Sequence, residues 1–415
     1  MKNLFVLFSI VFSSLSVVAQ SWYEVSVDAT TKLTSIDFPS SSVGYIVGDS
    51  GVMLKTVDGG VNWDAINYTG IQIPVDPPNF SDIDFVDELT GFLVVPGVSP
   101  GVYKTIDGGL TWVSDETTSN MCFKNCVYPM DADNWFLGGS GCFQSAMVDK
   151  QTPAGWSIST VNYESFNPGE IVMQMDFNGT VGLAAMAGQY MLRSADSGAT
   201  WDTIPTGLSG FGFLTSVMFA TADTCYAGYD DNGGGFGVLK STDAGLTWEQ
   251  DINSATFFYP SYLSVGKAAN GDVYLGARPS NWPNGLIFET TDGVNWLYEE
   301  VDQAINSIAS YGNDVTFAVG DSGYVVVNTL LGNLGTDEMD LNEINVFPNP
   351  TMDKLNIVFE ESPTYLQLTN LEGREVRRIT LHGEKKLTID VSELSNGIYL
   401  ITTDGASPPI RFVKQ

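Results

Sequence analysis

Short apolar stretches alternate with polar and glycine-rich turns along most of the chain, in an order that repeats. Each unit begins with an apolar run, passes a turn into a second run that often ends in glycine, and continues into a third run. The first run occurs seven times, at residues 33–38, 83–86, 126–128, 171–177, 214–219, 262–265 and 305–309. Short apolar runs bounded by turns predict β-strands. Four such strands in a period of about 45 residues are typical of a β-propeller blade.

Tryptophan marks the same period. Seven of these residues follow one another at intervals of 41 to 49 residues: Trp22, Trp63, Trp112, Trp156, Trp201, Trp248 and Trp296. The seventh unit, residues 304–331, offers three strands and no tryptophan, whereas the segment around Trp22 resembles those that begin the fourth strand elsewhere. We therefore predict an all-β fold whose first domain is a seven-bladed β-propeller closed by the N-terminal strand. Closure removes the exposed edges that an open sheet would present.

Four of the tryptophans end the same pattern, in which Ser or Thr precedes Asp, then Gly, then Trp, and a fifth copy is one residue shorter. The carboxylate can accept bonds from the turn's N–H groups, the glycine tolerates positive φ, and the hydroxyl can bond locally. The pattern recurs in nearly every unit, whereas an active site is needed once, so we interpret it as structural. Its carboxylates and rings are Asp58, Trp63, Asp107, Trp112, Asp196, Trp201, Asp243, Trp248, Asp292 and Trp296.

This pattern resembles the Asp-box, or bacterial neuraminidase repeat, family. The resemblance implies that the box joins the third and fourth strands of a blade and lies on the face opposite the usual ligand site. In the third unit the box is lost and Trp156 alone keeps the phase. Residues 44–51 and their echo at 317–323 are most similar to the branch of photosystem assembly factors. That branch implies protein binding through the propeller face, without catalytic residues.

The two ends of the chain differ from the repeats. Residues 1–19 have the Lys2 charge, apolar run and small-residue end of a signal peptide. The propeller is expected over 20–332, a linker over 333–342, and a small β-sandwich over 343–415. After residue 19 the chain contains no apolar run of 18 residues, so we expect no transmembrane segment.

The C-terminal domain resembles the sorting domain of type IX secretion cargo, found in Bacteroidetes. The resemblance rests on Pro348, Asn349, Pro350, Gly397 and Lys414 in combination. It implies that the partner is the type IX secretion machinery, and that the protein is secreted or held on the outer cell surface after export through the periplasm. The alternative is an ordinary accessory sandwich domain.

The chain is strongly acidic, with a net charge of −31, and residues 20–336 hold 36 Asp and Glu against 9 Lys and Arg. Nucleic acid is therefore a poor partner, because phosphate binding needs a cationic surface. Solubility is one explanation of the acidity and calcium binding by clustered loop carboxylates is the other. We expect no other cofactor. The single histidine, His382, lies outside the propeller, which disfavours zinc.

Three of the four cysteines, Cys122, Cys126 and Cys142, fall in the unit that lost its box. Export permits a disulfide there. Cys126 and Cys142 are a candidate pair, although their expected places on first and third strands leave direct contact open.

Enzyme classes can be tested by counting residue types. Sialidases bind the substrate carboxylate with three arginines, and the propeller has only Arg193 and Arg278. A Ser-His-Asp triad is excluded there because the propeller has no histidine. A glycoside hydrolase that uses two carboxylates stays open, since acidic residues are plentiful. Asp37, Asp84 and Asp176 recur at one position of the unit, which favours a structural role, and we assign no catalytic residue.

Two long loops on adjacent blades, together with the run that connects these blades, are the predicted ligand site. They offer aromatic, acidic and guanidinium groups that suit a sugar or a peptide: Tyr229, Asp230, Asp231, Tyr259, Arg278 and Trp282. The alternative is a set of exposed loops in which Gly and Asn only form turns. We therefore expect an exported, non-catalytic binding propeller for a protein or polysaccharide, with the hydrolase as the alternative. The sequence does not specify the ligand or the oligomeric state.

Overall fold

A computed structural model gives the fold, and the chain divides into two compact units, Met1–Thr329 and Leu330–Gln415. Each unit is described by itself. The structure describes residues 22–73, 77–97, 101–115, 121–142, 146–162, 170–208, 212–230, 236–253, 260–267, 271–279, 284–311, 315–329, 344–347, 351, 353–359, 363–370, 374–395, 397–403 and 410–414. The predicted signal peptide, linker and Pro348-Asn349-Pro350 motif lie outside these residues.

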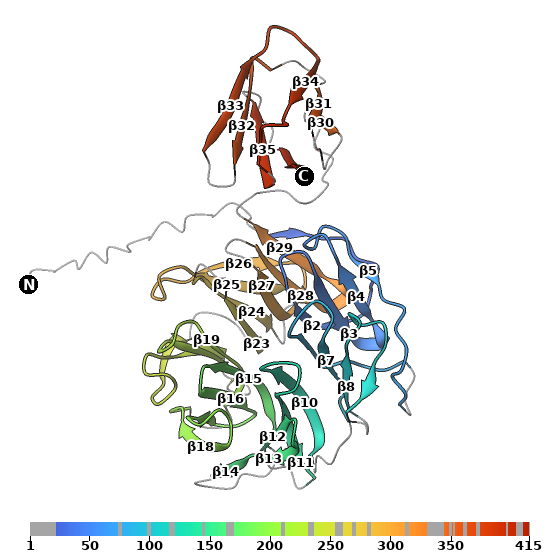
Figure 1. Cartoon of the computed structure of the whole chain (residues 1–415). Coiled ribbons are helices and arrows are strands. Elements are labelled where there is room, and N and C mark those ends of the chain that lie inside the picture. The colour runs from blue at the N-terminus through green and yellow to red at the C-terminus, as the bar shows by residue number, and fades with distance from the viewer. Residues whose placement is uncertain are drawn as a thin grey trace, which may run out of the picture. The chain divides into compact units, whose positions relative to one another are not determined.

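The described part of the first unit forms seven β-sheets, arranged around a common centre in Figure 1. Neighbouring strands are antiparallel, except that β14 adds to the fourth sheet in parallel. From the innermost strand outward, the first three sheets are β2 (Leu33–Asp37), β3 (Gly44–Gly48), β4 (Met53–Thr56) and β5 (Asp64–Ala65); β6 (Asp82–Phe85), β7 (Gly91–Val94), β8 (Val102–Thr105) and β9 (Val113–Ser114); and β10 (Met121–Pro129), β11 (Trp135–Gly141), β12 (Ala146–Thr152) and β13 (Gly155–Ile158).

The remaining sheets of this unit follow the same plan. They are β15 (Val172–Asn178), β16 (Val181–Met186), β17 (Tyr190–Ser194), β18 (Thr200–Pro205) and β14 (Thr160–Asn162); β19 (Phe213–Phe219), β20 (Cys225–Asp230), β21 (Phe236–Ser241) and β22 (Glu249–Asn253); β23 (Pro260–Lys267), β24 (Val273–Pro279), β25 (Gly285–Thr290) and β26 (Leu297–Val301); and β27 (Ile305–Tyr311), β28 (Val315–Gly320), β29 (Val325–Thr329) and β1 (Trp22–Glu24).

The innermost strands contact one another in a closed cycle: β2, β6, β10, β15, β19, β23, β27 and again β2. The last sheet combines both ends of the unit, because β1 pairs antiparallel with β29 and places Trp22 opposite Asn328. Trp22 is 2% exposed and meets Tyr274 of the preceding sheet edge-to-face. The predicted propeller, closed by its N-terminal strand, is therefore confirmed.

Aromatic side chains fill the spaces between neighbouring sheets. Tyr45 on β3 stacks on Phe85 at the end of β6, with ring centroids 3.7 Å apart. Phe136 stacks in the same way on Phe177 of the next sheet. The tryptophan that follows each of these phenylalanines packs edge-to-face against it, as Trp112 does against Phe85. Each interface therefore buries three rings supplied by two sheets, and rings of this size dominate the apolar burial of a core.

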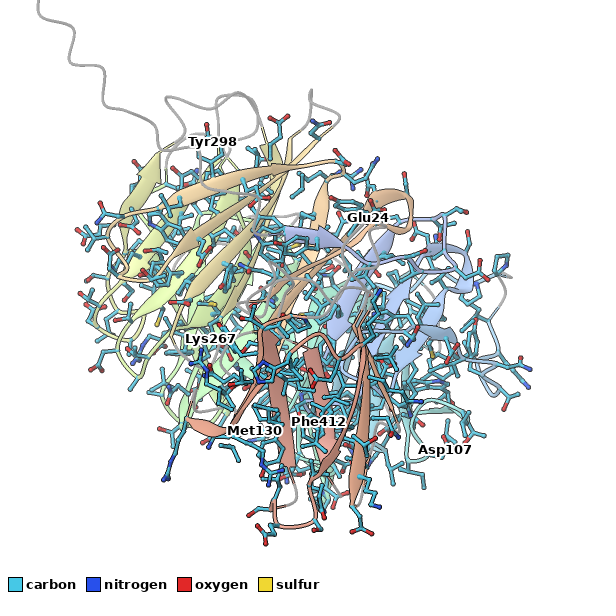
Figure 2. All side chains as sticks on the ribbon, turned by 90° about the horizontal axis from the view of Figure 1, so that it is seen from above. Glu24, Asp107, Met130, Lys267, Tyr298 and Phe412 are labelled. Atoms are coloured by element: carbon cyan, nitrogen blue, oxygen red, sulfur yellow. A yellow bond between two sulfur atoms is a disulfide. The ribbon has the colours of Figure 1, made fainter. Side chains whose placement is uncertain are left out.

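The repeated Asp turns are held by their own polar groups. In the second sheet, Thr105 Oγ1 donates to Asp107 Oδ1 at 2.9 Å and accepts from the N–H of Gly109 at 3.0 Å. Asp107 Oδ1 also accepts from the Thr111 N–H at 2.9 Å, and Asp107 Oδ2 accepts from the Thr111 hydroxyl at 2.6 Å. Trp112 Nε1 donates to the Gly109 carbonyl at 3.0 Å. The turn lies at the periphery of the view in Figure 2, where Asp107 is labelled.

On the third strand of several sheets, a cation reaches into the next sheet. Lys55, Lys150, Arg193 and Lys240 donate to the carbonyls of Gly108, Ser197, Ala244 and Gly293, which belong to the following Asp turn. Each of the three lysines also lies over the aromatic ring of its own second strand; the Lys55 Nζ is 4.9 Å from the Tyr45 centroid. At these three lysines the contact between sheets is therefore a hydrogen bond combined with a cation–π contact.

The second unit is a two-sheet β-sandwich in its described residues. One sheet contains β30 (Ile344–Phe347), β31 (Lys354–Phe359) and β34 (Lys386–Asp390), and the other contains β33 (Glu375–Thr380), β32 (Tyr365–Asn370), β35 (Gly397–Thr403) and β36 (Ile410–Lys414). Leu355 and Ile389 from the first sheet pack with Leu366, Ile401 and Phe412 from the second. Gly397 begins β35 opposite Lys414, the last residue of β36.

The disulfide differs from the candidate pair. Cys122 bonds to Cys142, with their Cα atoms 4.9 Å apart, while Cys126 is buried with a free thiol. A β-bulge between Lys124 and Cys126 explains the difference. Cys126 packs in the core with Val172 and Met175. Cys122 lies at the start of β10, and Cys142 directly follows the end of β11.

We expect the Asp107→Ala substitution to lower the free energy of unfolding by about 1–3 kcal/mol, because it removes the acceptor of several hydrogen bonds within one turn. Asp107→Asn keeps one acceptor and should cost less. Urea unfolding of the purified chain measures the change. The exposed strand carboxylate Asp64 is the control, and Asp64→Ala should change stability by less than about 0.5 kcal/mol. Equal effects at the two positions would contradict the structural role of the turn.

Candidate functional site

A channel runs through the centre of the closed ring. It encloses about 630 Å³ and is lined by residues of the inner strands and of the loops at one mouth. At that mouth lie Lys32, Asp49, Asn79 and Arg278, and deeper in the channel lie carboxylates from β2 and β6. The volume is within the range of small-molecule and peptide-segment sites.

Two copies of the motif Gly-Asp-Ser-Gly shape the mouth. Residues Asp49–Gly51 and Asp321–Gly323 each form a single 3₁₀ turn, in which Ser50 and Ser322 have a φ of 59°. The turn after Gly48 bonds to Lys32 and Pro78 of the backbone, and Asn79 Oδ1 accepts from Ser50 N–H at 2.9 Å. Both turns fix an aspartate at the end of a second strand, on adjacent sheets.

Arg278 occupies the corresponding strand position on the sheet before Asp321. Its guanidinium makes a two-point contact with the Asp321 carboxylate: Nη2 lies 3.0 Å from Oδ2 and Nη1 lies 3.3 Å from Oδ1. Asn306 Nδ2 donates to the same carboxylate at 3.0 Å and to the Leu33 carbonyl at 2.9 Å. The side chains of Arg278 and Asp321 stay 37% and 27% exposed, so this ion pair faces the solvent at the mouth.

The deeper carboxylates join neighbouring inner strands. Asp37 Oδ2 accepts from the Phe85 N–H at 2.8 Å, Asp82 Oδ2 accepts from the Val127 N–H at 2.9 Å, and Asp176 Oδ2 accepts from the Phe219 N–H at 2.6 Å. In each case the donor is in the next sheet of the ring. These aspartates therefore connect successive sheets through their backbones.

Burial raises the pKa of these carboxyl groups. Desolvation raises the pKa of Asp37 to about 7 and that of Asp82 to about 6, although the backbone N–H groups that they accept from oppose the shift. Burial, followed by the charges of Asp37 and Asp82, holds the pKa of Asp84 well above its usual range. Each residue keeps some accessible surface towards the channel, but protein surrounds its carboxyl group.

The site offers charges and hydrogen-bonding groups rather than metal ligands. No group of three or more His, Cys, Asp or Glu side chains is placed to hold a metal ion in the described part of the chain. A ligand at the mouth would meet both cationic and anionic side chains beside a polar channel.

The structure separates the predicted ligand residues. Arg278 lines the channel mouth. Tyr229 and Asp230 belong to β20 instead of a loop and are 4% and 6% exposed, with Tyr229 in the apolar core. The strand extends further than expected, because Asp230 pairs with both Phe213 and Phe236 before the glycine-rich segment begins. Asp231, Tyr259 and Trp282 lie outside the described residues.

Sequence reasoning missed the other residues of the mouth, Lys32, Asp49, Asn306 and Asp321. The repeated Gly-Asp-Ser-Gly motif was the available signal, since it places an aspartate at one position of two units. In the described residues, no helix has the length and hydropathy of a membrane span.

The raised carboxyl pKa values predict how stability depends on pH. Between about pH 4 and pH 7 the folded state holds protons that the unfolded chain has lost. The protonated carboxyl groups therefore contribute to the stability of the folded state, and this stabilisation is complete below about pH 4 and is lost as the pH rises through about 6 to 7. Asp37→Asn should therefore reduce the fall in Tm between pH 5 and pH 8 by about 1–3 °C. Asp87→Asn is the control, since hydrogen bonds from Leu89 and Thr90 lower the pKa of that carboxyl out of this range. Identical pH profiles for the wild type and Asp37→Asn would exclude this assignment.

Comparison with known proteins finds a family match in each of the two units. Residues 345–409 match the family model of the secretion system C-terminal sorting domain. Residues 15–69 match the model of the photosynthesis system II assembly factor YCF48. The chain thus carries a sorting domain of type IX secretion, which points to a secreted or cell-surface protein.

Two curated relatives and one solved structure cover most of the first unit. The xyloglucanase of Hypocrea jecorina is 25% identical over 259 residues, covering 60% of this chain, which spans only 28% of that relative's length. The photosystem II assembly lipoprotein Ycf48 of Nostoc sp. is 24% identical over 273 residues, which is 55% of this chain and 76% of the relative. The structure of YCF48 bound to D1 peptide aligns with a TM-score of 0.56 at 14% identity, over 75% of this chain and 98% of that one. The chain is therefore a β-propeller similar to Ycf48, followed by a secretion sorting domain.

Proposed function

We propose that this protein is an exported, non-catalytic binding propeller that holds a segment of another extracellular protein at the mouth of its central channel. The observation that carries the proposal is the solvent-facing ion pair of Arg278 and Asp321 beside a cavity of about 630 Å³. The sorting domain supports delivery to the cell surface or the medium.

Charge at the mouth favours a peptide over a neutral glycan. Lys32 and Arg278 provide cations, and Asp49 and Asp321 provide anions, within one rim. A polypeptide carries groups that complement both signs, together with backbone donors and acceptors. A similar structure is that of YCF48 bound to D1 peptide. A polysaccharide ligand is the other outcome of the test below.

The deeper carboxylates argue against hydrolysis as the main activity. Asp37, Asp82 and Asp176 each accept a backbone N–H from the next sheet with one oxygen, so each of these carboxyl groups is fixed to the wall of the ring. A hydrolytic pair must instead flank the scissile bond of a sugar and leave one oxygen free to donate a proton or attack.

A glycoside hydrolase is the second candidate, because one relative is a xyloglucanase and Asp84 has a strongly raised pKa in the channel. A carboxyl group whose pKa is raised can serve as a general acid. This role would make Asp84 the residue on which activity depends.

The binding function can be tested with the purified chain on an array of synthetic peptides and an array of glycans. We expect retention of a subset of peptides and a loss of about tenfold in their affinity with Arg278→Ala, since one charged contact at an interface rim is removed. Lys385→Ala, an exposed lysine of the sorting domain, should leave binding unchanged. Retention confined to glycans, or binding that Arg278→Ala does not weaken, would contradict the proposal.

The hydrolase is tested separately by release of reducing sugar from xyloglucan and other soluble β-glucans. On our proposal the wild-type chain releases none above the blank. Activity that Asp84→Asn lowers by about a hundredfold or more would instead establish the second candidate, since general acid catalysis contributes at least that much.

A further inference from the structure

Polar side chains on the inner strands bond to the next sheet in a fixed register. Asp176 on β15 accepts from the Phe219 N–H of β19, and Gln174, two residues earlier, accepts from the Val217 N–H at 3.1 Å. The two donors are likewise two residues apart, and Phe219 is the last residue of β19. Two positions on one inner strand therefore meet backbone donors at the matching positions of the next inner strand.

The second and third sheets repeat this register, but one donor is missing. Asp82 on β6 accepts from the Val127 N–H of β10. Asp84 lies two residues after Asp82, and the matching donor position, two residues after Val127, is Pro129 at the end of β10. Proline has no backbone N–H. The backbone donor that acts on Asp84 is its own neighbour Phe85, and no described N–H of the third sheet bonds to it. This carboxylate therefore lacks the bond that fixes the equivalent carboxylate of the fourth sheet.

The Asp84 carboxylate faces the channel. Asp84 lines the channel together with Asp37 and Asp82, and each keeps accessible surface. In the described residues, neither Asp84 oxygen is an enclosed atom without a partner, so a ligand in the channel can reach this group. The described cations that line the channel are Lys32 and Arg278, both at the mouth. Its inner part thus presents three carboxyl groups and no described cation.

Electrostatics favours a cation beside these groups. The charges of Asp37 and Asp82 add to burial in raising the pKa of Asp84, and a bound cation would relieve this repulsion and stabilise the ionised carboxylate. Residues 20–336, with 36 acidic and 9 basic side chains, also attract cations from solution. A primary ammonium group donates three N–H bonds, so it can bond to the Asp84 carboxylate and to neutral oxygens of the wall at once.

We propose that the inner part of the channel binds a primary alkylammonium group, which donates to the Asp84 carboxylate. The ligand must be slender, because Asp37, at the same position of its sheet as Asp84, lies five residues beyond Lys32, or about 16 Å along an extended strand. A lysine at the end of an extended peptide and a linear polyamine share this chemistry and shape. The inference rests on the proposed binding function and deepens it, since it names the group that enters beyond the mouth.

The proposal is tested by isothermal titration calorimetry of the full chain with n-butylammonium chloride, and with 1-butanol as the uncharged probe. Titration at pH 8 keeps Asp37 and Asp82 ionised. We expect saturable binding of the ammonium ion and none of the alcohol. Asp84→Asn removes the charge at nearly constant volume and should weaken binding by about tenfold. Pro129→Ala supplies the missing N–H, which fixes Asp84 to the third sheet, and should weaken binding as well.

Asp87→Asn is the matched control, because it removes one exposed carboxylate just after β6 and changes the net charge equally. It should leave the affinity unchanged, and thermal unfolding identifies variants that have lost their fold. Two further probes distinguish the sources of the ammonium group. Spermidine represents a free polyamine, and the acetylated peptide Gly-Gly-Gly-Lys, compared with its norleucine analogue, represents a lysine side chain.

Three results would overturn the proposal: no saturable heat from any ammonium probe up to about 10 mM, equal binding of 1-butanol, or an affinity that a folded Asp84→Asn retains. If peptides still bind through Arg278 in that case, the proposed function stands and only the assignment of the inner channel fails.

Discussion

The interface between neighbouring sheets is the contact on which the first unit depends. A sheet of four or five short strands cannot bury both its faces alone, so its stability comes from the sheets on either side. At these interfaces apolar burial and polar bonding are combined: Tyr45 stacks on Phe85, Lys55 covers the Tyr45 ring and bonds to the next turn, and Asp37 bonds to the next inner strand. Burial of the aromatic rings stabilises the interface, and the hydrogen bonds fix the orientation of one sheet relative to the next.

The same interfaces account for the positions of most Lys and Arg side chains in this acidic ring. Residues 20–336 hold 9 Lys and Arg, and five of them, Lys55, Lys104, Lys150, Arg193 and Lys240, reach into the next sheet from one strand position. Most positive charge is thereby committed to assembly at the outer turns. The channel mouth differs because Arg278 stands where the next sheet carries Asp321 and the sheet after that carries Asp49.

The repeat, the closure and the sandwich could be predicted from sequence because each depends on local patterns that recur. The turn around Asp107 is an example, since all of its partners lie within four residues of the carboxylate. The channel could not be predicted, because its lining comes from inner strands that are distant in sequence and meet only in the closed ring. Tyr229 and Asp230 were misplaced for a related reason: a glycine-rich segment suggested a loop, but pairing on both sides extends β20 through Asp230.

The pairing of β1 with β29 has a consequence for how the chain matures. The strand made first in the ring is the outer neighbour of the strand made last, so no partial product of synthesis has a complete final sheet. Before residues 325–329 emerge, the growing molecule is an open arc with an unpaired strand edge at its growing end, a surface that invites pairing with other chains. Contacts that join the two ends of a long segment also form slowly. The time between synthesis of the first strand and synthesis of the last is therefore the period in which this protein most needs protection from its own copies.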